Sequence, residues 1–341
     1  MTPVAGADDA RWYTVEEVGH GTAVPRAATA LATQLGLPQA RIDGLAILAT
    51  ELTSNLYKHA REGTVLVRSL RLGPVAGVEL VAVDAGPGMT DVAASSRDGH
   101  STAGTLGIGL SAIERAATSW DVYSLPGRGT VTAIQVWPDG VPRPAWVQGI
   151  ARPITGERSN GDGFAARVLD GRGQVVVCDG LGHGPLAEAA TQAALRAFDT
   201  APAAGPATVV EHLHRALRGT RGAAIMVAEL DPVGATVLCA GLGNIAGAIV
   251  APGYRRQLVT VPGIAGTQAR GLREFSYPFP AEGALVLHSD GVTGRWTLDE
   301  YPGLLTRTPI AIAATLLRDY GIRRDDASVL VATAGSGGAD G

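Results

Sequence analysis

The stretch from Val177 to Gly184 reads VCDGLGHG, an apolar run that ends in an aspartate and a glycine-rich loop. A similar arrangement occurs at residues 288–292, HSDGV, where Asp290 ends a second apolar run. Aspartate is depleted within strands, so we expect both carboxylates to mark strand ends. Acidic segments also occur at residues 160–164 (NGDGF) and 324–328 (RDDAS). Carboxylates that converge at strand ends need cations to offset their charge.

The residue types in these segments indicate which cation they suit. The set is rich in oxygen ligands, lacks thiolates and has little histidine, which favours Mg²⁺ or Mn²⁺ over zinc. Two such ions, typically about 3.5 to 4 Å apart, can activate water and clamp a phosphate for in-line displacement. The pair Asp170-Gly171, by contrast, is predicted to be an ordinary hairpin turn.

A second constellation lies on a predicted helix, in the segment ELTSNLYKH at residues 51–59. Glu51, Asn55 and Lys58 are spaced so that they share one helix face. Glu51 is a candidate base toward a water or hydroxyl, Asn55 offers an oxygen to Mg²⁺, and Lys58 is a candidate nucleotide contact. Taken alone, the same spacing is also that of a solvated polar face.

Three glycine clusters follow this helix. The apolar run from Val81 ends in Asp84, and Gly86 and Gly88 then form a turn that permits close approach to a ligand. Residues 104–110, GTLGIGL, begin a predicted helix, where unpaired amides and the helix dipole favour phosphate. Residues 127–130, GRGT, open a strand. Each cluster alone reads as a turn, but the four elements in this order predict a nucleotide site.

The pattern along the chain predicts two domains of the α+β class. The run Pro138 to Pro144 cannot sustain a helix or a central strand, so we place the linker there. The expected organisation is a first domain at 1–137, a linker at 138–146, a second domain at 147–334 and a disordered tail at 335–341. Apolar spacing predicts helices at 22–35, 39–60, 106–117, 185–198 and 208–218. Strands are expected at 64–72, 78–84, 119–124, 130–136, 164–169, 174–178, 223–230, 236–240, 246–251, 256–261, 284–289 and 327–332.

Composition narrows the class of protein. The 341 residues include 46% hydrophobic and 18% charged residues, enough apolar side chains for two cores. The net charge of -4 and the lack of a Lys/Arg cluster argue against nucleic acid or an acidic membrane as a partner. We expect a cytoplasmic protein because neither a leader sequence nor a long apolar run occurs. Cys178 and Cys239 lie in apolar runs, so no disulfide framework is expected.

The elements of the first half resemble the GHKL family of ATPases and kinases, and within it the switch kinases of the RsbW and RsbT kind, over about Thr14 to Trp137. The resemblance implies the Bergerat ATP-binding fold, an α/β sandwich, with Mg²⁺ and ATP as cofactors. It assigns the N-box to Glu51 and Asn55, and adenine recognition to Asp84 with support from Thr130. The lid glycines that it implies are Gly104, Gly107 and Gly109.

The acidic segments resemble the SpoIIE-type branch of the PPM metal-dependent Ser/Thr phosphatases, over about Val147 to Ala334, and the compact RsbX-like enzymes most of all. The resemblance implies an α-β-β-α sandwich with two Mn²⁺ or Mg²⁺ ions. Asp326 matches a variable neighbour that orients the site. His183 is a candidate to protonate the leaving serine oxygen, or else to pack the loop. The implied metal ligands are Asp162, Asp179, the carbonyl of Gly180, Asp290 and Asp325.

Together the two resemblances imply a bifunctional enzyme of a partner-switching pathway, which phosphorylates and dephosphorylates Ser or Thr of STAS-domain proteins. The alternative is an ATP-dependent module that binds an anti-sigma or antagonist protein without kinase activity, joined to an active phosphoserine phosphatase. A histidine-kinase remnant attached to an unrelated hydrolase is weaker, because the two halves pair naturally as a switch. A sigma factor or switch protein is a further candidate partner, and a homodimer stays open.

Overall fold

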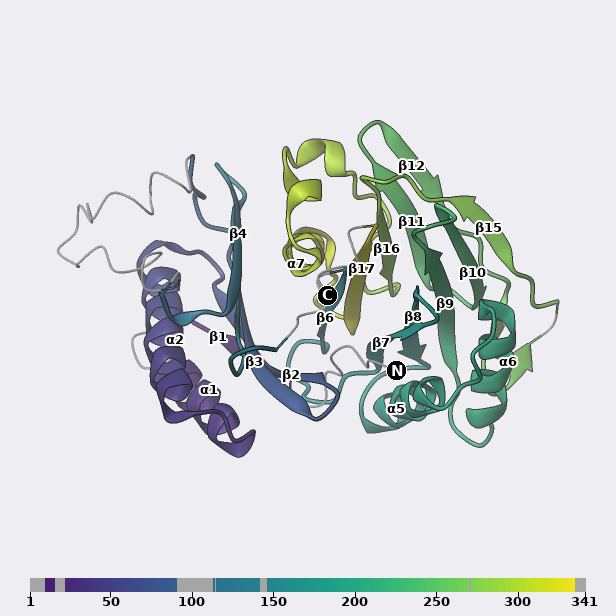
Figure 1. The fold of residues 1–341 in the computed structure, drawn as a ribbon, viewed down its shortest axis with the longest axis horizontal. Coiled ribbons are helices and arrows are strands. Elements are labelled where there is room, and N and C mark those ends of the chain that lie inside the picture. The colour runs from purple at the N-terminus through teal and green to yellow at the C-terminus, as the bar shows by residue number, and fades with distance from the viewer. Residues whose placement is uncertain are drawn as a thin grey trace. The chain divides into compact units, whose positions relative to one another are not determined.

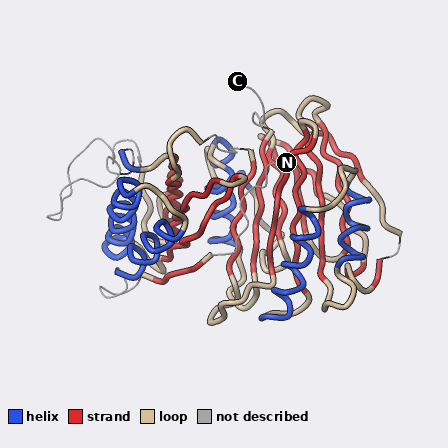
Figure 2. Tube along the Cα trace, turned by 60° about the horizontal axis from the view of Figure 1, so that its bottom comes forward, coloured by secondary structure: helices blue, strands red, loops and turns tan. Residues whose placement is uncertain are grey.

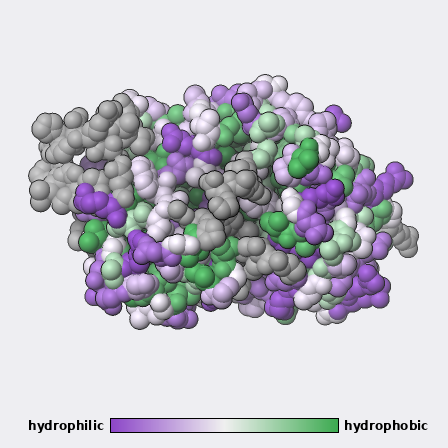
Figure 3. Space-filling view, in the orientation of Figure 1, coloured by the Kyte–Doolittle hydropathy of each residue, from purple (hydrophilic) through white to green (hydrophobic). Residues whose placement is uncertain are grey.

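The computed structural model describes residues 10–15, 22–90, 113, 115–141, 146–269 and 271–334. The chain divides between Arg143 and Pro144 into two compact units, and this boundary lies inside the segment that the sequence predicts as a linker. Helices and strands of both units are drawn in Figure 1 and Figure 2. No helix in the described ranges is long and apolar enough to cross a membrane. Hydrophilic and hydrophobic residues are intermingled on the face drawn in Figure 3.

The described part of the N-terminal unit is an antiparallel sheet with two helices on one face. The strand order is β1-β2-β3-β5-β4. Apolar residues of both helices pack against the inward residues of β2, β3 and β5. The helix residues include Leu48 and Leu52, and the strand residues include Val67, Leu80 and Ile134. The elements are β1 (Arg11–Thr14), α1 (Ala23–Gln34), α2 (Gln39–His59), β2 (Thr64–Leu72), β3 (Val75–Val83), β4 (Ser119–Leu125) and β5 (Gly129–Val136).

The C-terminal unit contains two antiparallel sheets packed face to face. The first sheet has the order β15-β10-β9-β8-β7 and the second β12-β11-β16-β17-β6. The strands are β6 (Val147–Arg152), β7 (Asp162–Leu169), β8 (Arg172–Gly180), β9 (Ala223–Asp231), β10 (Thr236–Leu242), β11 (Ala246–Ala251), β12 (Tyr254–Gln257), β15 (Phe275–Pro278), β16 (Ala284–His288) and β17 (Ala327–Thr333). A small hairpin is formed by β13 (Gly263–Ile264) and β14 (Gln268–Ala269).

Apolar side chains from both sheets fill the space between them, including Phe164, Val177, Ile249, Leu285 and Leu330. Helices cover the outer faces, as Figure 1 shows: α5 (Pro185–Asp199) and α6 (Pro206–Ala216) pack on the first sheet, and α7 (Pro309–Tyr320) packs on the second. Two short 3₁₀ helices, η2 (Leu298–Glu300) and η3 (Leu304–Thr306), precede α7. The result is the α-β-β-α sandwich that the sequence predicts.

Several elements differ from the sequence-based expectation. The strand predicted at 256–261 instead spans Tyr254–Gln257, because the turn at Gly253, with φ +68°, begins the return strand of the hairpin earlier. The helix predicted at 106–117 falls largely outside the described residues. Among the described elements, the periodicity did not predict β1, β6, α7, the short strands β13, β14 and β15, or the 3₁₀ helices η2 and η3.

Candidate functional site

The predicted carboxylates of the C-terminal unit lie at one end of the sandwich. Asp162 begins β7 and pairs across the hairpin with Asp179, the last but one residue of β8. Asp290 follows β16 and Asp325 precedes β17, and these two strands are antiparallel neighbours. The charges of Asp162, Asp290 and Asp325 all act on Asp179. Strand register therefore brings together four carboxylates that are distant in sequence.

Glycines next to these aspartates allow the backbone to pack tightly around the cluster. A Cβ on Gly180 would lie 2.3 Å from the carbonyl oxygen of Ala187, in the first turn of α5. On Gly291 it would lie 1.8 Å from the carbonyl oxygen of Asp326, so the Asp290 turn touches the start of β17. The backbone amide of Ile322 also donates to the Gly291 carbonyl at 2.7 Å. The Asp-Gly pairs are thus close-packing positions rather than free turns.

Burial and mutual repulsion destabilise the ionised form of these carboxyl groups. Burial is the largest cause that raises the pKa of Asp179 to about 9, and the charges of its three acidic neighbours add to it. Burial also raises the pKa of Asp162 to about 7, although the hydroxyls of Ser289 and Ser328 oppose the shift. The pKa of Asp325 is raised by burial and then by Asp290. The cluster therefore favours binding of protons or cations.

The donor set fits hard divalent cations. The Oδ2 atom of Asp162 is buried and accepts no hydrogen bond, an arrangement that is costly for a carboxylate unless a cation or proton meets it. Every side-chain donor in the cluster is an oxygen, the preference of Mg²⁺ and Mn²⁺. In the described part of the chain, however, no three His, Cys, Asp or Glu side chains already converge closely enough to hold one ion together.

Asp326 connects the cluster to the loop that leads into β7. Its Oδ1 accepts a hydrogen bond from the amide of Ile154 at 2.7 Å, and its Oδ2 accepts one from the amide of Gly161 at 2.8 Å. The side chain is buried. Both carboxylate oxygens are therefore engaged by the backbone, and Asp326 supports the loop immediately before Asp162.

His183 lies in the exposed loop between β8 and α5. Its Nδ1 is 2.8 Å from Oε1 of Glu157, and its side chain is 62% exposed. Its charge lowers the pKa of Asp325, so the imidazole lies near the carboxylate cluster. With Nδ1 held by a carboxylate, Nε2 is the ring nitrogen left for a reacting group.

Residues that the sequence did not single out also contribute to this end of the sandwich. Asn244 donates from Nδ2 to Oδ2 of Asp290 at 2.6 Å, and Ser328 donates its amide to the hydroxyl of Ser289 at 3.0 Å. Neither Asn244 nor Glu157 is next to an acidic motif, so no local signal could have found them. Ser289 and Ser328, by contrast, lie within two residues of Asp290 and Asp326, and this closeness in sequence is a local signal that could have indicated them.

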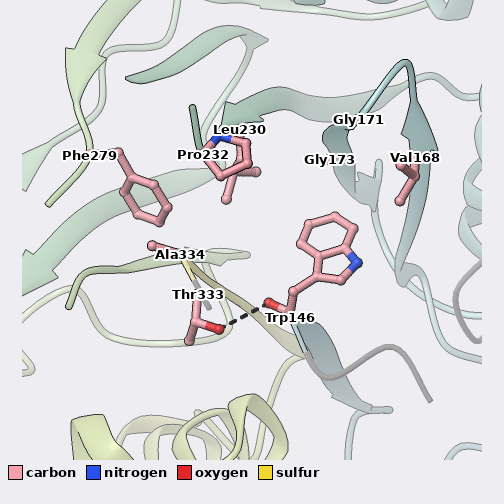
Figure 4. Close-up of a pocket in the computed structure, with 9 residues that line it drawn as sticks. All are labelled: Trp146, Val168, Gly171, Gly173, Leu230, Pro232, Phe279, Thr333 and Ala334. Atoms are coloured by element: carbon pink, nitrogen blue, oxygen red, sulfur yellow. Dashed lines mark hydrogen bonds between the residues drawn. The ribbon is translucent and has the colours of Figure 1, made fainter. Parts of the chain in front are cut away.

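A separate apolar hollow of about 30 Å³ lies at the opposite end of the sandwich. Figure 4 shows the rings of Trp146 and Phe279 turned toward it, beside Thr333, whose hydroxyl donates to the Trp146 carbonyl at 3.4 Å. The turn of the β7–β8 hairpin, at Gly171, also lines it. None of the cluster carboxylates lines this hollow.

In the N-terminal unit, the predicted nucleotide residues lie on α2 and around the end of β3. Glu51 is half-buried, whereas Asn55 and Lys58 are exposed on the same helix. Asp84 follows β3, and its Oδ1 accepts from the amide of Gly86 at 2.7 Å. A Cβ on Gly86 would lie 2.9 Å from the carbonyl oxygen of His59, so this turn packs against the end of α2.

The β4–β5 hairpin forms the other side of this turn. The amide of Asp84 donates to the carbonyl of Thr130 at 3.0 Å, and the hydroxyls of Ser124 and Thr130 are 2.9 Å apart. A Cβ on Gly88 would lie 2.0 Å from the carbonyl oxygen of Leu125, a contact that only glycine permits. Ser124, which the sequence did not indicate, also accepts from the amide of Met89 at 2.8 Å. The lid glycines Gly104, Gly107 and Gly109 lie outside the described residues.

Comparison with known families separates the chain into the same two parts. Residues 15–135 match the model of a histidine kinase-like ATPase domain, and residues 170–334 match that of stage II sporulation protein E (SpoIIE). The serine/threonine-protein kinase RsbT of Bacillus subtilis (strain 168) is 32% identical over 88 residues, which are 26% of this chain and 66% of the relative. The chain thus covers just under two thirds of that relative's length.

Solved structures also resemble the chain. One, from work on the bacterial stressosome as a modular system adapted to control secondary messenger signalling, is 29% identical, with a TM-score of 0.51 over 55% of this chain and 98% of that one. RsbX in complex with magnesium is 17% identical, with a TM-score of 0.49 over 56% of this chain and 96% of that one. The two family matches therefore fall in different units of the fold, that of the histidine kinase-like ATPase domain in the N-terminal unit and that of SpoIIE in the C-terminal sandwich.

Proposed function

We propose that the chain regulates a partner-switching pathway by both phosphorylating and dephosphorylating Ser or Thr of a STAS-domain protein. The observation that carries the phosphatase half is the placement of four carboxylates at one end of the sandwich, where three of them act on Asp179, with a buried and unpartnered oxygen on Asp162. The observation that supports the ATP half is the packing of the Asp84 turn between the end of α2 and the β4–β5 hairpin.

In the phosphatase half, the carboxylates of Asp162, Asp179, Asp290 and Asp325 hold two Mn²⁺ or Mg²⁺ ions together with the carbonyl of Gly180. When bound, these ions offset the carboxylate charge, polarise the phosphate and lower the pKa of water. The pairing of Asp162 with Asp179 in the β7–β8 ladder fixes the backbone positions of both residues. Asp326 holds the loop before Asp162, so the ligand shell is supported from the backbone.

His183 supplies the proton for the leaving serine oxygen. Glu157 binds Nδ1 and thereby orients the ring, the arrangement of a general acid whose position is fixed by a third group. Exposure of the side chain leaves it accessible to a phosphoprotein that approaches this end of the sandwich.

In the ATP half, Glu51 accepts the proton of the attacking hydroxyl and Asn55 contributes an oxygen to Mg²⁺. Asp84 and Thr130 contact the adenine, Lys58 meets the phosphates, and the turn at Gly86 and Gly88 gives the nucleotide close approach to the backbone. Similarity to RsbT, a serine/threonine-protein kinase, supports phosphoryl transfer as the reaction of this half.

The test is to incubate the protein with γ-labelled ATP, Mn²⁺ and a STAS-domain protein from the same cell. We expect the STAS-domain protein to gain label and then lose it. Glu51→Ala should block the gain, and a chelator added after labelling should block the loss. Gain of label with the Glu51→Ala variant would contradict the kinase assignment.

The same experiment separates the alternative function. If ATP binds and the STAS-domain protein, or a sigma factor or switch protein, is captured only when ATP is present, yet never gains label, the ATP half is a binding module. Loss of label from a partner that another kinase has phosphorylated would then remain as the only catalytic activity.

A further inference from the structure

Asn244 lies on the connection that crosses from one sheet of the C-terminal sandwich to the other. This connection leads from β10 in the first sheet to β11 in the second. It is anchored on both sides of the asparagine: the amide of Gly243 donates to the Val261 carbonyl at 2.9 Å, and Ile245 is buried in the core. Gly243 has φ +96°, and a Cβ there would lie 2.6 Å from Ala224. The backbone therefore holds Asn244 in a defined place.

The side chain of Asn244 makes one short contact, to Oδ2 of Asp290 at 2.6 Å. A carboxylate can only accept hydrogen bonds when ionised, so the amide nitrogen must be the atom that faces it. Both side chains are exposed, and a hydrogen bond in water contributes little net stability to a fold. The contact is therefore notable for its place, on a proposed metal ligand, and not for its contribution to folding.

Asp290 differs from the other carboxylates in how it is held. Asp162 and Asp179 belong to paired strands, and Asp325 accepts a hydrogen bond from the amide of Asp326 at 3.0 Å. Asp290 lies beyond the end of β16, as an exposed residue between the buried Ser289 and Gly291. Its Oδ2 is engaged by Asn244, and its charge is one of those that act on Asp179. Asp290 is therefore held between an amide on one side and the cluster on the other.

We infer that Asn244 is a positioning residue, which binds one oxygen of Asp290 and so turns the other oxygen toward Asp179 and the shared cation site. This inference rests on the proposed metal-dependent function. Because supporting residues of metal ligands typically contribute 10- to 100-fold to metal affinity, loss of the amide should weaken the binding of Mn²⁺ by that factor. Asn244 touches neither phosphate nor leaving group in this assignment.

The experiment compares the full-length wild type with N244A and with the control E282A, which truncates an exposed polar side chain at the opposite end of β16. Titration calorimetry with Mn²⁺ alone measures affinity, and scanning calorimetry in chelator measures the metal-free Tm. We expect Mn²⁺ to bind N244A about 10- to 100-fold more weakly. The metal-free Tm should stay within about 2 °C of wild type, and E282A should match wild type in both measurements.

Hydrolysis of an aryl phosphate gives a second readout. If Asn244 acts through Asp290, the Mn²⁺ concentration for half-maximal rate rises in N244A, while the rate at saturating Mn²⁺ recovers to within about threefold of wild type. Unchanged Mn²⁺ affinity in N244A, or a fall in metal-free Tm that accounts for the weaker binding, would overturn the inference. Failure of the wild type itself to bind Mn²⁺ would instead reject the proposed metal-dependent function.

Discussion

The two candidate sites of this chain are built in different ways. In the C-terminal unit, strand register brings acidic side chains to one end of the sandwich, where burial and then their like charges raise the pKa of Asp162 and Asp179. In the N-terminal unit, Asn55 and Lys58 lie exposed on a helix, and the Asp84 turn is shaped by backbone contacts at Gly88 and Gly129. The first site is organised by charge, and the second by close approach of the backbone.

Because the two sites are built differently, we expect them to respond differently to substitutions. Removal of one carboxylate from a crowded set of proposed ligands changes the charge and the coordination together, so we expect large effects. A site that depends on backbone fit should respond to added volume, and less strongly, because a protein can relax around one methyl group. Measurements on both halves of the same chain test this contrast directly, since each half is the internal control for the other.

The largest expected effect follows from Asp290→Ala. The variant loses a proposed ligand, so its Mn²⁺-dependent hydrolysis of a phosphoserine peptide should fall by more than about 100-fold, beyond the cost of losing a supporting contact. ATP binding by the other half, measured by calorimetry, should be unchanged. A phosphatase rate within tenfold of wild type would show that Asp290 holds no catalytic cation, and would remove the basis of the contrast between the two sites.

His183→Ala is expected to have the next largest effect. Loss of a general acid typically costs about 100-fold or more, and the cost depends on how much the leaving group needs a proton. Hydrolysis of a phosphoserine peptide should therefore slow by about 100-fold, whereas an aryl phosphate, whose leaving group is a weaker base, should be affected much less. Equal losses with both substrates would indicate that His183 only packs the loop with Glu157.

The acidic cluster should also make stability depend on pH. Asp162 and Asp179 have folded pKa values of about 7 and about 9, raised above the ordinary value of 3.8. Their contribution to stability is fully present below pH 3.8, and it is lost as pH rises through 7 and then 9. For each proton that the folded chain holds and the unfolded chain does not, the unfolding free energy falls by about 1.4 kcal/mol per pH unit.

Scanning calorimetry of the full chain in chelator should therefore show a falling Tm for the C-terminal unit between pH 5 and pH 9. Excess Mn²⁺ should oppose this trend, because a cation binds the ionised carboxylates and needs them deprotonated. The transition that Mn²⁺ shifts identifies the C-terminal unit, and the other transition is the control. A Tm in chelator that does not change with pH would contradict the burial of the cluster.

The sequence predicts much of the fold, and its failures have physical causes. Helix α2 was predicted because its apolar residues recur every three to four positions and face one side of the sheet. Helix α7 was missed because residues Pro309 to Leu317 are all buried, so no polar face marks a period. The edge strand β1 was missed because it has only four residues and pairs on one side.

The candidate site shows a similar limit. The places of Asp179, Asp290 and Asp325 could be predicted because each lies next to an apolar run, whereas Asp162 was assigned by the family resemblance. Asn244 and Glu157 could not, because their partners, Asp290 and His183, are 46 and 26 residues away in the chain. Local patterns report which residues end a strand, whereas contacts between loops depend on the register of strands that no short segment encodes.

The smallest expected effect concerns the ATP half, and it tests whether close approach of the backbone organises that site. Gly127 and Gly129 both have positive φ, +78° and +93°, so alanine is strained at either position. A Cβ on Gly127 would meet nothing within 4 Å, whereas one on Gly129 would lie 2.0 Å from the carbonyl oxygen of Asp84. The difference between Gly129→Ala and Gly127→Ala therefore isolates the close approach of the hairpin to the Asp84 turn.

We expect Gly129→Ala to weaken ATP binding by about tenfold more than Gly127→Ala does, which corresponds to the roughly 1–3 kcal/mol of an overpacked contact. Calorimetric titration with ATP measures both variants, and Mn²⁺-dependent phosphatase activity is the control that neither should change. If the two variants bind ATP equally, backbone fit at Asp84 does not shape the nucleotide site, and the exposed residues of α2 must carry its affinity instead.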